Sequence, residues 1–380
     1  MMLESPLVAV FVTEFLKYSQ TFIFDEIRHH ERYEVEVFCH RRVNEGLFAY
    51  PRVHSLTPAS GALGEIEALL YKATAVSPRF LRHLRRLRPN LLHAHFGPGS
   101  IYALPIRQAL NVPLVVTFHG YDVPALRGLS RFRPSNWRYA LFARTLLRSV
   151  DRFLAASTEL ADMLVGLGAP PGRVRVWRTG VEVPPLAPRS GRPGGPVILM
   201  AGRFVEKKGF EYGLEAFASV AGRHPGARLR LIGDGPRRAR YERLIRARGI
   251  ADKVELAGVL PHHETLAEMA RADVLLAPSV VAPNGDRESG VVVIKEANAR
   301  GVPAIGTRHG GIPEIIDHED TGLVVGERDV QALAEGLHTL IASPTLREAM
   351  GRRAREKMIR DYEITDCVRA LERHYDEVIG

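Results

Sequence analysis

Short apolar runs alternate with helical stretches along this chain of 380 residues, and that alternation limits the fold more than any other feature. The strands that it predicts in the first half cover 7–13, 34–40, 90–95, 113–118 and 151–156. The predicted helices between them cover 20–32, 63–87 and 100–110. This spacing indicates an α/β fold, with a parallel sheet covered by helices on both faces. Ligands of such sheets bind at the carboxyl ends of the strands.

A run dense in proline and glycine, VPPLAPRSGRPGGP at 183–196, interrupts the alternation and predicts an interdomain linker. Strands are expected again at 197–201, 228–232, 253–257 and 273–277, followed by helical sequence over 344–375 with a kink near Asp361. Because 380 residues are too many for a single hydrophobic core, we expect two domains. The boundaries are placed at 1–183 for a first Rossmann-like domain, 184–196 for the linker, 197–358 for a second Rossmann-like domain and 359–380 for a final helix.

The composition is that of a folded protein, with 46% hydrophobic and 25% charged residues. Its two cysteines, Cys39 and Cys367, are far apart, which argues against a disulfide framework or a zinc site. No apolar stretch reaches the ~18 residues that a spanning helix needs, and Glu4 and Pro6 stand where a signal would be basic and then apolar. We therefore expect a cytoplasmic protein, or one peripheral to the inner membrane face.

The net charge of +9 and a pI near 9.7 favour anionic partners. Arginines cluster in RHLRRLR at 82–88 and again at Arg127, Arg131, Arg133, Arg138, Arg144, Arg148 and Arg152. Leu, Phe and Trp137 lie between them, as in an amphipathic helix at a membrane surface. Two interpretations stay open: an anionic membrane surface as partner, or a solvated basic face.

The stretch GDRESGVVVIKEANARGVP at 285–303 predicts a polar loop, a helix and a stop. Glu288 precedes the first turn, and Glu296 lies eight positions on, about two turns at 3.6 residues per turn. The backbone N–H groups at the helix start, which favour an anion such as a diphosphate, belong to Ser289, Gly290 and Val291. The arrangement suits a nucleotide-sugar, with the sugar on Glu288 and the ribose on Glu296. A capped helix with solvated glutamates is the alternative.

Basic residues follow the first strand of the second half, in GRFVEKKGF at 202–210. Arg203 and Lys208 are the candidates to neutralise two phosphates, with Lys207 as the competitor of Lys208. A solvated basic turn is the alternative.

Two further glycine turns follow later strands. They are IGDGP, which contains Gly233 and Gly235, and AGVLP, where backbone groups at Val259 and Leu260 could contact a base. Arg238 stands where a dinucleotide fingerprint needs its third glycine. The sequence also lacks Asp-x-Asp, P-loop and Gly-x-Ser-x-Gly motifs, so protein cations and a helix dipole would have to stabilise a leaving diphosphate without a metal.

These motifs, in this order, resemble the retaining glycosyltransferases of family GT4, which have the GT-B fold of two facing Rossmann-like domains with parallel sheets and an interdomain cleft. The resemblance covers nearly the whole chain and is strongest from 197 to 325, where Gly-Gly-Ile-Pro-Glu-Ile at 310–315 adds to the turns above. The resemblance implies that Arg203 and Lys208 bind the donor diphosphate and that Glu296 binds the ribose. It also implies that Glu288 lies near the reacting sugar carbon. His119 would approach the sugar from the first domain, which is the acceptor side.

The chain departs from many relatives after its first strand, where TEFLKYSQTFI at 13–23 replaces a glycine-rich loop. This stretch resembles a subgroup with a Ser-Glu-Thr-Phe-Ile signature, similar to colanic acid and other exopolysaccharide transferases, with Gln20 in place of the Glu. Acceptor-side candidates are Ser19, Thr21 and Asp122.

The sequence thus predicts a retaining, metal-independent hexosyltransferase of the EC 2.4.1 type that uses no cofactor. It would move a hexose from a UDP- or GDP-sugar to a glycan or lipid-linked glycan in polysaccharide biosynthesis, with no nucleic-acid partner. The alternatives are a GT-B nucleotide-sugar epimerase or phosphorylase, or a non-catalytic protein that binds a nucleotide-sugar or a membrane surface. The donor base, the sugar, the acceptor and the linkage stay open.

Overall fold

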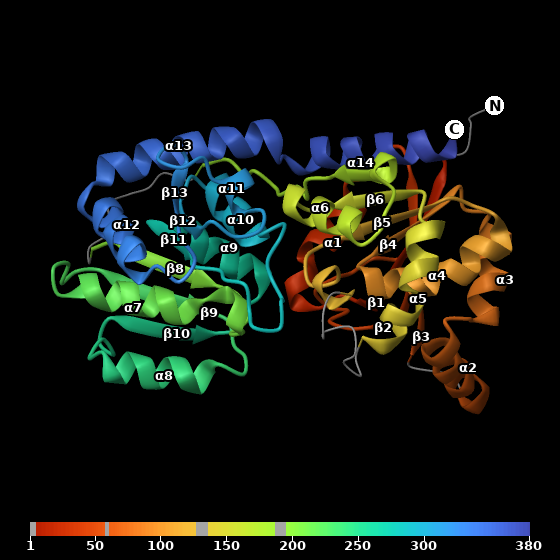
Figure 1. Cartoon of the computed structure of the whole chain (residues 1–380), viewed down its shortest axis with the longest axis horizontal. Helices are drawn as coiled ribbons and strands as arrows, with labels where there is room; N and C mark the ends of the chain where they lie inside the picture. The colour runs from red at the N-terminus through yellow and green to blue at the C-terminus, as the bar shows by residue number, and fades with distance from the viewer. Residues whose placement is uncertain (1–4, 58–60, 127–135, 187–194) are drawn as a thin grey trace. The chain divides into compact units, whose positions relative to one another are not determined.

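The computed structural model describes residues 5–57, 61–126, 136–186 and 195–380 (Figure 1). The chain divides into two compact units: unit 1 comprises Met1–Gly180 and Ile364–Gly380, and unit 2 comprises Val181–Glu363. Most of the expected linker, 187–194, lies outside the described residues, as do Glu4, Arg127, Arg131 and Arg133.

The described residues of unit 1 form a seven-stranded parallel sheet in the order β3-β2-β1-β4-β5-β6-β7. Its strands are β1 Leu7–Phe15, β2 Glu34–Arg42, β3 Val53–Thr57, β4 Leu91–His95, β5 Leu114–Phe118, β6 Arg152–Ala155 and β7 Val174–Val176. The predicted parallel α/β sheet is confirmed. The sequence does not predict β3 and β7, because these edge strands are short and include His, Ser or Arg.

The helices of unit 1 are α1 Thr21–Arg28, α2 Gly61–Thr74, α3 Pro78–Leu87, α4 Gly97–Leu110, α5 Trp137–Ser149, α6 Thr158–Gly166 and α14 Ile364–Ile379. Short 3₁₀ turns are η1 Tyr18–Gln20, η2 Pro124–Leu126 and η4 Pro171–Arg173. The single helix expected over 63–87 is two helices, α2 and α3. Ser77 separates them, because its Oγ accepts the Phe80 N–H at 3.0 Å and Pro78 occupies the first position of α3.

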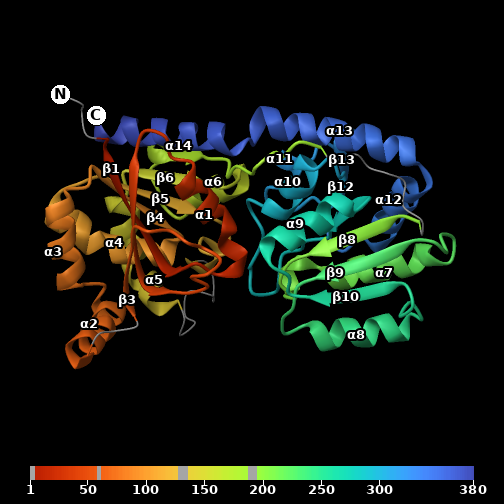
Figure 2. The same cartoon turned by 180° about the vertical axis from the view of Figure 1, so that it is seen from behind.

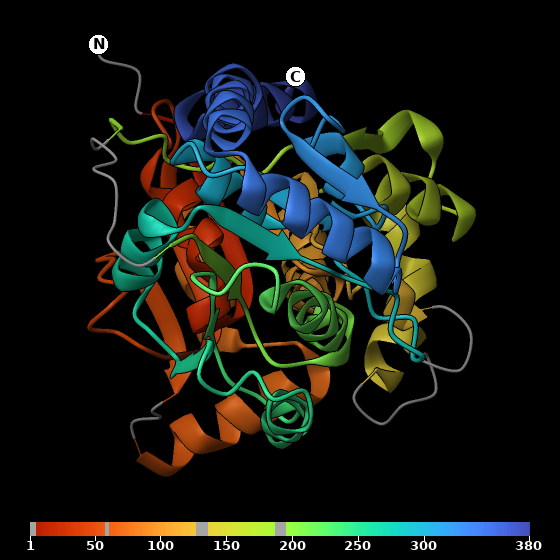
Figure 3. The ribbon, with the colours of Figure 1, turned by 90° about the vertical axis from the view of Figure 1, so that its left-hand side faces the viewer.

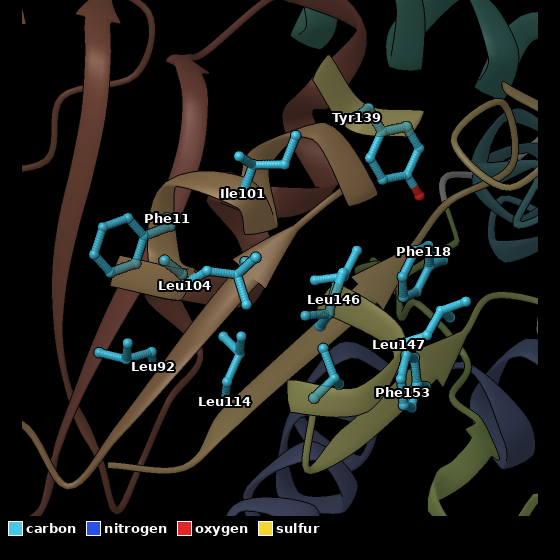
Figure 4. Close-up of a cluster of buried hydrophobic side chains, with 14 of the residues drawn as sticks. Phe11, Leu92, Ile101, Leu104, Leu114, Phe118, Tyr139, Leu146, Leu147 and Phe153 are labelled. Atoms are coloured by element: carbon cyan, nitrogen blue, oxygen red, sulfur yellow. The ribbon is translucent and has the colours of Figure 1, made fainter. Parts of the chain in front are cut away.

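Alternate residues of the unit 1 strands pack on opposite helix layers. Phe11 and Leu92 face α4 and α5, where Figure 4 shows them in one cluster with Leu104 and Leu146. Val10, next to Phe11, packs on the other face with residues of α1 and α14. This alternation explains why the strands are nearly continuous apolar runs, since both faces of the sheet are covered.

Helix α14 packs in unit 1, although it follows unit 2 in the chain. The Trp177 indole N–H donates to the Cys367 carbonyl at 3.1 Å. The buried Glu372 carboxylate accepts the backbone N–H groups of Glu31 and Arg32, each at 3.0 Å. Burial raises the pKa of Glu372, but His30 and these backbone donors outweigh it and lower the pKa to about 2. Hydrogen bonds as well as apolar contacts therefore hold α14 in place.

The described residues of unit 2 form a six-stranded parallel sheet in the order β10-β9-β8-β11-β12-β13. Its strands are β8 Val197–Ala201, β9 Arg228–Ile232, β10 Val254–Gly258, β11 Val274–Ala277, β12 Ala304–Thr307 and β13 Gly322–Val325. Its helices are η5 Glu206–Lys208, α7 Phe210–Ala221, α8 Arg238–Ala247, α9 His262–Arg271, α10 Val292–Ala299, α11 Ile312–Ile315, α12 Val330–Ala342 and α13 Pro344–Asp361. Figure 3 shows the elements of this unit in green to blue from another side.

The strand order of each sheet contains a point at which a ligand site is expected. In unit 1 the first strand, β1, lies between β2 and β4, and in unit 2 β8 lies between β9 and β11. Chain order reverses at these points, and open parallel sheets bind their ligands there, outside the carboxyl ends of the strands. No helix in the described part of the chain combines the length and apolar character of a membrane-spanning helix.

Candidate active site

Three turns at the carboxyl ends of β8, β9 and β10 pack tightly against one another. The Gly233 N–H donates to the Gly258 carbonyl at 2.7 Å. A Cβ at Gly233 would lie 2.0 Å from the Gly202 carbonyl oxygen, and one at Gly235 would lie 2.8 Å from that of Phe204. Both glycines have positive φ, +132° and +154°. Gly233 and Gly235 are therefore required where they stand, because no side chain fits this backbone.

The structure brings Lys208 and Glu288 together beside these turns. Lys208 Nζ donates to Glu288 Oε2 at 3.1 Å. The Lys208 side chain lies across Gly202, since a Cβ there would be 3.1 Å from Lys208 Cε. The two residues come from the η5 turn after β8 and from the loop before α10, so the sheet places side chains 80 positions apart in contact.

The neighbouring Lys207 has a different environment. Its Nζ lies 3.0 Å from Asp286 Oδ1, 3.1 Å from the Arg287 carbonyl and 3.3 Å from Glu288 Oε1. Burial lowers the pKa of this ammonium, but the Glu288 and Asp286 carboxylates raise it by more. Lys207 is buried and bound to three acceptors of one loop, whereas Lys208 contacts a single carboxylate. Lys207 therefore holds the loop, and Lys208 is the cation that can exchange its partner for a ligand.

Glu288 is a part-buried, ionised carboxylate. Burial raises its pKa, but the Lys207 and Lys208 ammonium groups together bring the pKa well below its usual range. Its carboxylate thus stays negative throughout the physiological pH range, with two permanent cations beside it.

A histidine fixes the backbone of Glu288. The Glu288 N–H donates to His309 Nε2 at 2.9 Å, and His309 Nδ1 lies 2.7 Å from Glu327 Oε1. Because Nε2 accepts a hydrogen bond, Nδ1 carries the proton and donates to Glu327. Burial raises the pKa of Glu327, but the Val281 N–H and His309 outweigh it and lower the pKa. We call this chain of contacts, Glu327–His309–Glu288, the unit 2 network.

Helix α10 begins just after the glutamate loop. Ser289 is buried and Gly290 is part-buried, and Val291 is the residue before the helix, with φ +26° and ψ 61°. A positive φ is rare for a β-branched residue. Local backbone strain of this kind clusters at ligand sites, which agrees with the expected anion position at the start of α10.

The other predicted donor-site residues lie around this centre. Arg203 is exposed, and its side chain makes no hydrogen bond or ion pair with the described residues. Val259, 58% exposed, and the part-buried Leu260 follow β10. Glu296 is on α10, and its Oε1 lies 2.8 Å from His262 Nε2. Glu296 therefore has a histidine partner in this state.

Unit 1 contains a second chain of carboxylate and histidine side chains at its strand ends. His95 Nε2, at the end of β4, lies 3.2 Å from Glu26 Oε1 of α1. His95 Nδ1 lies 3.1 Å from Nε2 of His119, which follows β5. Glu26 and His95 are fully buried, and His119 is part-buried between Phe22 and Phe96. We call Glu26–His95–His119 the unit 1 network; it ends on the residue expected to approach the sugar.

The acceptor-side candidates have three different environments. Ser19 is exposed in η1, while Thr21 is buried as the first residue of α1. Asp122 is fully buried, and its carboxylate accepts the N–H groups of Gly97 at 3.1 Å and Gly120 at 3.0 Å. Burial raises the pKa of Asp122 to about 6, although these hydrogen bonds oppose the rise. In this state Asp122 holds the His119 loop.

Comparison with known proteins identifies the chain. A model described as Glycosyltransferase Family 4 matches residues 26–183, and one described as Glycosyl transferases group 1 matches 187–357. A protein named as a colanic acid biosynthesis glycosyltransferase, WcaL, is similar in two organisms. The Escherichia coli K12 protein is 33% identical over 280 residues, 72% of this chain and 67% of its own length. The Salmonella typhimurium protein is 35% identical over 275 residues, which are 71% of this chain and 66% of that protein. This chain belongs to glycosyltransferase family 4.

Solved structures agree with the fold of this family 4 chain. Sucrose-phosphate synthase from Thermosynechococcus elongatus superposes with a TM-score of 0.77 at 20% identity, covering 98% of this chain and 99% of that one. HepE of Anabaena, in complex with UDP-glucose, gives a TM-score of 0.76 at 17% identity, with 98% and 99% covered. The predicted GT-B fold is confirmed, and so is the prediction of a glycosyltransferase. The chain spans about two thirds of the length of the two WcaL relatives.

Several residues of the two networks have no role predicted from the sequence. Glu26, Glu327 and the loop-holding contacts of Lys207 are not predicted. His95, a polar residue at a strand end, and His309, in the turn 307–314, are present without an assigned role. One signal was available for Glu26, because a carboxylate beside Ile23 and Ile27 lies on the buried face of its helix. Glu327 has no such signal, since only the fold brings it to His309.

Two groups of side chains in the described part of the chain have ligand atoms close enough for a metal ion: Glu26, His93 and His95, and Glu36, His54 and His83. In the first, both ring nitrogens of His93 are already bonded, to Thr117 Oγ1 and the Tyr375 hydroxyl at 2.7 Å each. In the second, His54 Nε2 lies 2.6 Å from Glu36 Oε2. His93 therefore has no free nitrogen for a cation, whereas Glu26 Oε1 and His95 Nε2 are buried without a hydrogen-bond partner among the described residues.

Proposed function

We propose that this glycosyltransferase is a retaining, metal-independent enzyme that moves a hexose from a UDP- or GDP-sugar to a glycan or lipid-linked glycan in polysaccharide biosynthesis. The observation that carries the proposal is the Lys208–Glu288 pair at the sheet edge beside β8, where chain order reverses. The relatives named for colanic acid biosynthesis support the pathway class, and the fold shared with a UDP-glucose complex supports the donor class.

The donor diphosphate would bind between the start of α10 and the basic turn after β8. Lys208 would leave Glu288 for a phosphate oxygen, and the exposed Arg203 would bind a second one. Glu288 would then be released to accept sugar hydroxyls, while Lys207 and His309 keep its loop in position. Glu296 would exchange His262 for the ribose hydroxyls.

In the transfer step the bond between the anomeric carbon and the diphosphate oxygen breaks. A bond from that carbon to the acceptor oxygen forms on the same face of the sugar. The acceptor proton passes to the leaving phosphate, so no side chain acts as nucleophile. Glu288, ionised and close to the reacting centre, would stabilise positive charge on the sugar, and Arg203 and Lys208 would stabilise the leaving diphosphate in place of a metal.

A thermal-shift panel with UDP, GDP, ADP and the matching sugar nucleotides tests the donor class. A ligand at 100 times its Kd stabilises a protein by about 2.7 kcal/mol, which is readily seen. We expect a shift with one uridine or guanosine series, also in the presence of EDTA. Absence of any shift, or a shift that needs Mg²⁺, contradicts the proposal.

Incubation of the donor with and without a glycan acceptor separates the alternatives. A transferase leaves the donor sugar largely intact until an acceptor is added and gives a product of the same anomeric configuration. Conversion of the sugar without acceptor indicates an epimerase, sugar release dependent on inorganic phosphate indicates a phosphorylase, and a shift without turnover indicates a binding protein.

A further inference from the structure

Helix α2 has apolar side chains on the face opposite the one that packs on unit 1. Its core-facing residues are Ala68 and Tyr71, both buried. Leu63, Ile66 and Leu70, at helical spacing, are 83%, 53% and 48% exposed. Residues three, four and seven apart share one side of a helix, so these three form a continuous row, which we call the α2 apolar face. A soluble helix normally carries polar residues there.

Helix α5 contributes a second exposed row next to α2. Trp137 and Leu141, four positions apart, are 55% and 66% exposed, and Arg144 and Arg148 continue the same side of the helix. The Arg138 guanidinium donates to the Lys72 carbonyl and so joins the start of α5 to the end of α2.

Tyr102 of α4 strengthens this junction. Its ring centroid lies 4.6 Å from that of Tyr71 in α2, and the Arg138 guanidinium carbon of α5 is 5.7 Å from the same ring. The two exposed rows therefore belong to one packed assembly of helices. Figures 1 and 2 show α2 and α3 at the outer side of β3, the edge strand of the unit 1 sheet.

Positive charge surrounds these apolar rows. Residues 61–88 contain six Lys and Arg against two Glu, and α5 contains three Arg and no acidic residue. One of the two glutamates, Glu67, is occupied by Ser77 Oγ at 2.7 Å and by the Arg79 N–H at 2.8 Å. Arg82, Arg85 and Arg86 of α3 are exposed. The surface therefore combines exposed Leu, Ile and Trp with a net positive field.

We infer that the α2 apolar face, with the exposed rows of α5 and the arginines of α3, docks on an anionic lipid bilayer. Leu63, Ile66, Leu70 and Trp137 would enter the boundary between headgroups and acyl chains, and the arginines would bind lipid phosphates. A second copy of the chain fits less well, because two surfaces of the same positive charge repel each other. Docking at this surface would bring the enzyme to the proposed lipid-linked acceptor, but the docking itself does not depend on transferase activity.

Sedimentation of the full chain with vesicles tests the inference. We expect binding to vesicles of phosphatidylcholine with phosphatidylglycerol at low salt, release at high salt, and little binding to phosphatidylcholine alone. Because a basic residue near an anionic surface contributes about 1 kcal/mol, R82Q/R86Q should weaken binding roughly 25-fold. R243Q/R246Q, which changes two exposed arginines of α8 and none of α2, α3 or α5, is the matched control and should bind like the wild type.

The triple variant L63S/I66S/L70S tests the apolar contribution and should bind at least tenfold more weakly. Ile359→Ser on α13, also 50% exposed, is its control. Trp137 gives a direct signal, because the only other tryptophan, Trp177, is 2% exposed, so a blue shift of fluorescence on vesicle addition reports Trp137 entering lipid.

Three outcomes would overturn the inference: no vesicle binding at low salt, equal binding by the triple serine variant, or a wild-type dimer that the serine variant converts to a monomer. The nucleotide thermal shift of each variant should equal that of the wild type. Vesicle binding without any nucleotide thermal shift would refute the proposed function and support the docking surface. A nucleotide thermal shift without vesicle binding would support the proposed function and refute the docking surface.

Discussion

The two units use the same pair of groups, a carboxylate and a histidine, for different ends. In unit 1, Glu26 and His95 lead to His119, a side chain that is part-buried. In unit 2, Glu327 and His309 lead to a backbone N–H, that of Glu288. The unit 1 network therefore orients a side chain, whereas the unit 2 network fixes a loop and leaves the Glu288 carboxylate to its lysines.

The two networks also differ in the basic groups beside their carboxylates. Glu288 lies between the ammonium groups of Lys207 and Lys208, 3.3 Å and 3.1 Å away. The basic side chains nearest to Glu26 are His95 at 3.2 Å and His93 at 3.6 Å. Unit 2 thus pairs its carboxylate with lysines, and unit 1 places its carboxylate beside histidines.

The largest effect is expected at Glu288. Glu288→Gln keeps the shape and removes the negative charge beside the reacting carbon, so kcat should fall about 10³-fold while donor Kd changes only a few-fold. Steady-state transfer kinetics and nucleotide titration measure the two quantities. Glu319→Gln, on a residue with a largely exposed side chain, is the control. Wild-type turnover of Glu288→Gln would end its assigned role.

The second prediction separates the two adjacent lysines. Lys208→Met should weaken nucleotide binding about 10- to 100-fold with little change in Tm, because Lys208 exchanges partners with the donor. Lys207→Met should instead lower the free energy of unfolding by about 3 kcal/mol or more, because it removes the buried ammonium that Asp286, Glu288 and the Arg287 carbonyl share. The opposite pattern would exchange the roles of the two residues.

The third prediction compares the networks directly. Glu327 accepts both the His309 ring N–H and the Val281 N–H, and a glutamine has only one accepting atom. Glu327→Gln should therefore loosen the Glu288 loop and lower kcat roughly tenfold at unchanged donor Kd. Glu26→Gln in unit 1 changes the group that contacts His95, which in turn contacts His119, so it should also lower kcat. Wild-type kcat in both variants would show that neither network positions the site.

The last prediction concerns Asp122 and measures stability instead of activity. Its folded-state pKa, raised to about 6 against an ordinary value of 3.8, means that the ionised form is disfavoured in the fold. As pH rises from about 4 to about 6, this group should lower the free energy of unfolding by up to roughly 3 kcal/mol. Glu288 has the opposite sign: its stabilising contribution is complete above about pH 5 and is lost progressively as the pH falls below that. Denaturant titrations of wild type and Asp122→Asn should show the slope in the wild type and a reduced slope in the variant.

Much of the fold could be predicted because the apolar runs are short and well bounded. Strands β8 and β9 have the predicted limits, 197–201 and 228–232. The edge strands β3 and β7 could not be predicted, since their stability comes from pairing with a neighbour that the local sequence does not reveal.

The site divides in the same way. Residue types at strand ends identify Lys208 and Glu288 as candidates, since a cation and a carboxylate suit a diphosphate and a sugar. Which of Lys207 and Lys208 holds the loop and which can bind the donor is not predictable from the sequence, because two adjacent lysines differ only in the direction that the backbone gives their side chains. The pairing of His309 with Glu327 depends on β12 and β13 lying side by side.

The placement of α14 affects how the protein is made. A ribosome completes residues 5–180 of unit 1, then all of unit 2, and only afterwards residues 364–379. Until then the nascent first half lacks Leu371 and Tyr375, and the apolar side chains that these two cover, such as Ile27 and Trp177, are open to solvent. We therefore expect the emerging chain to depend on chaperones for longer than its early strands alone would suggest.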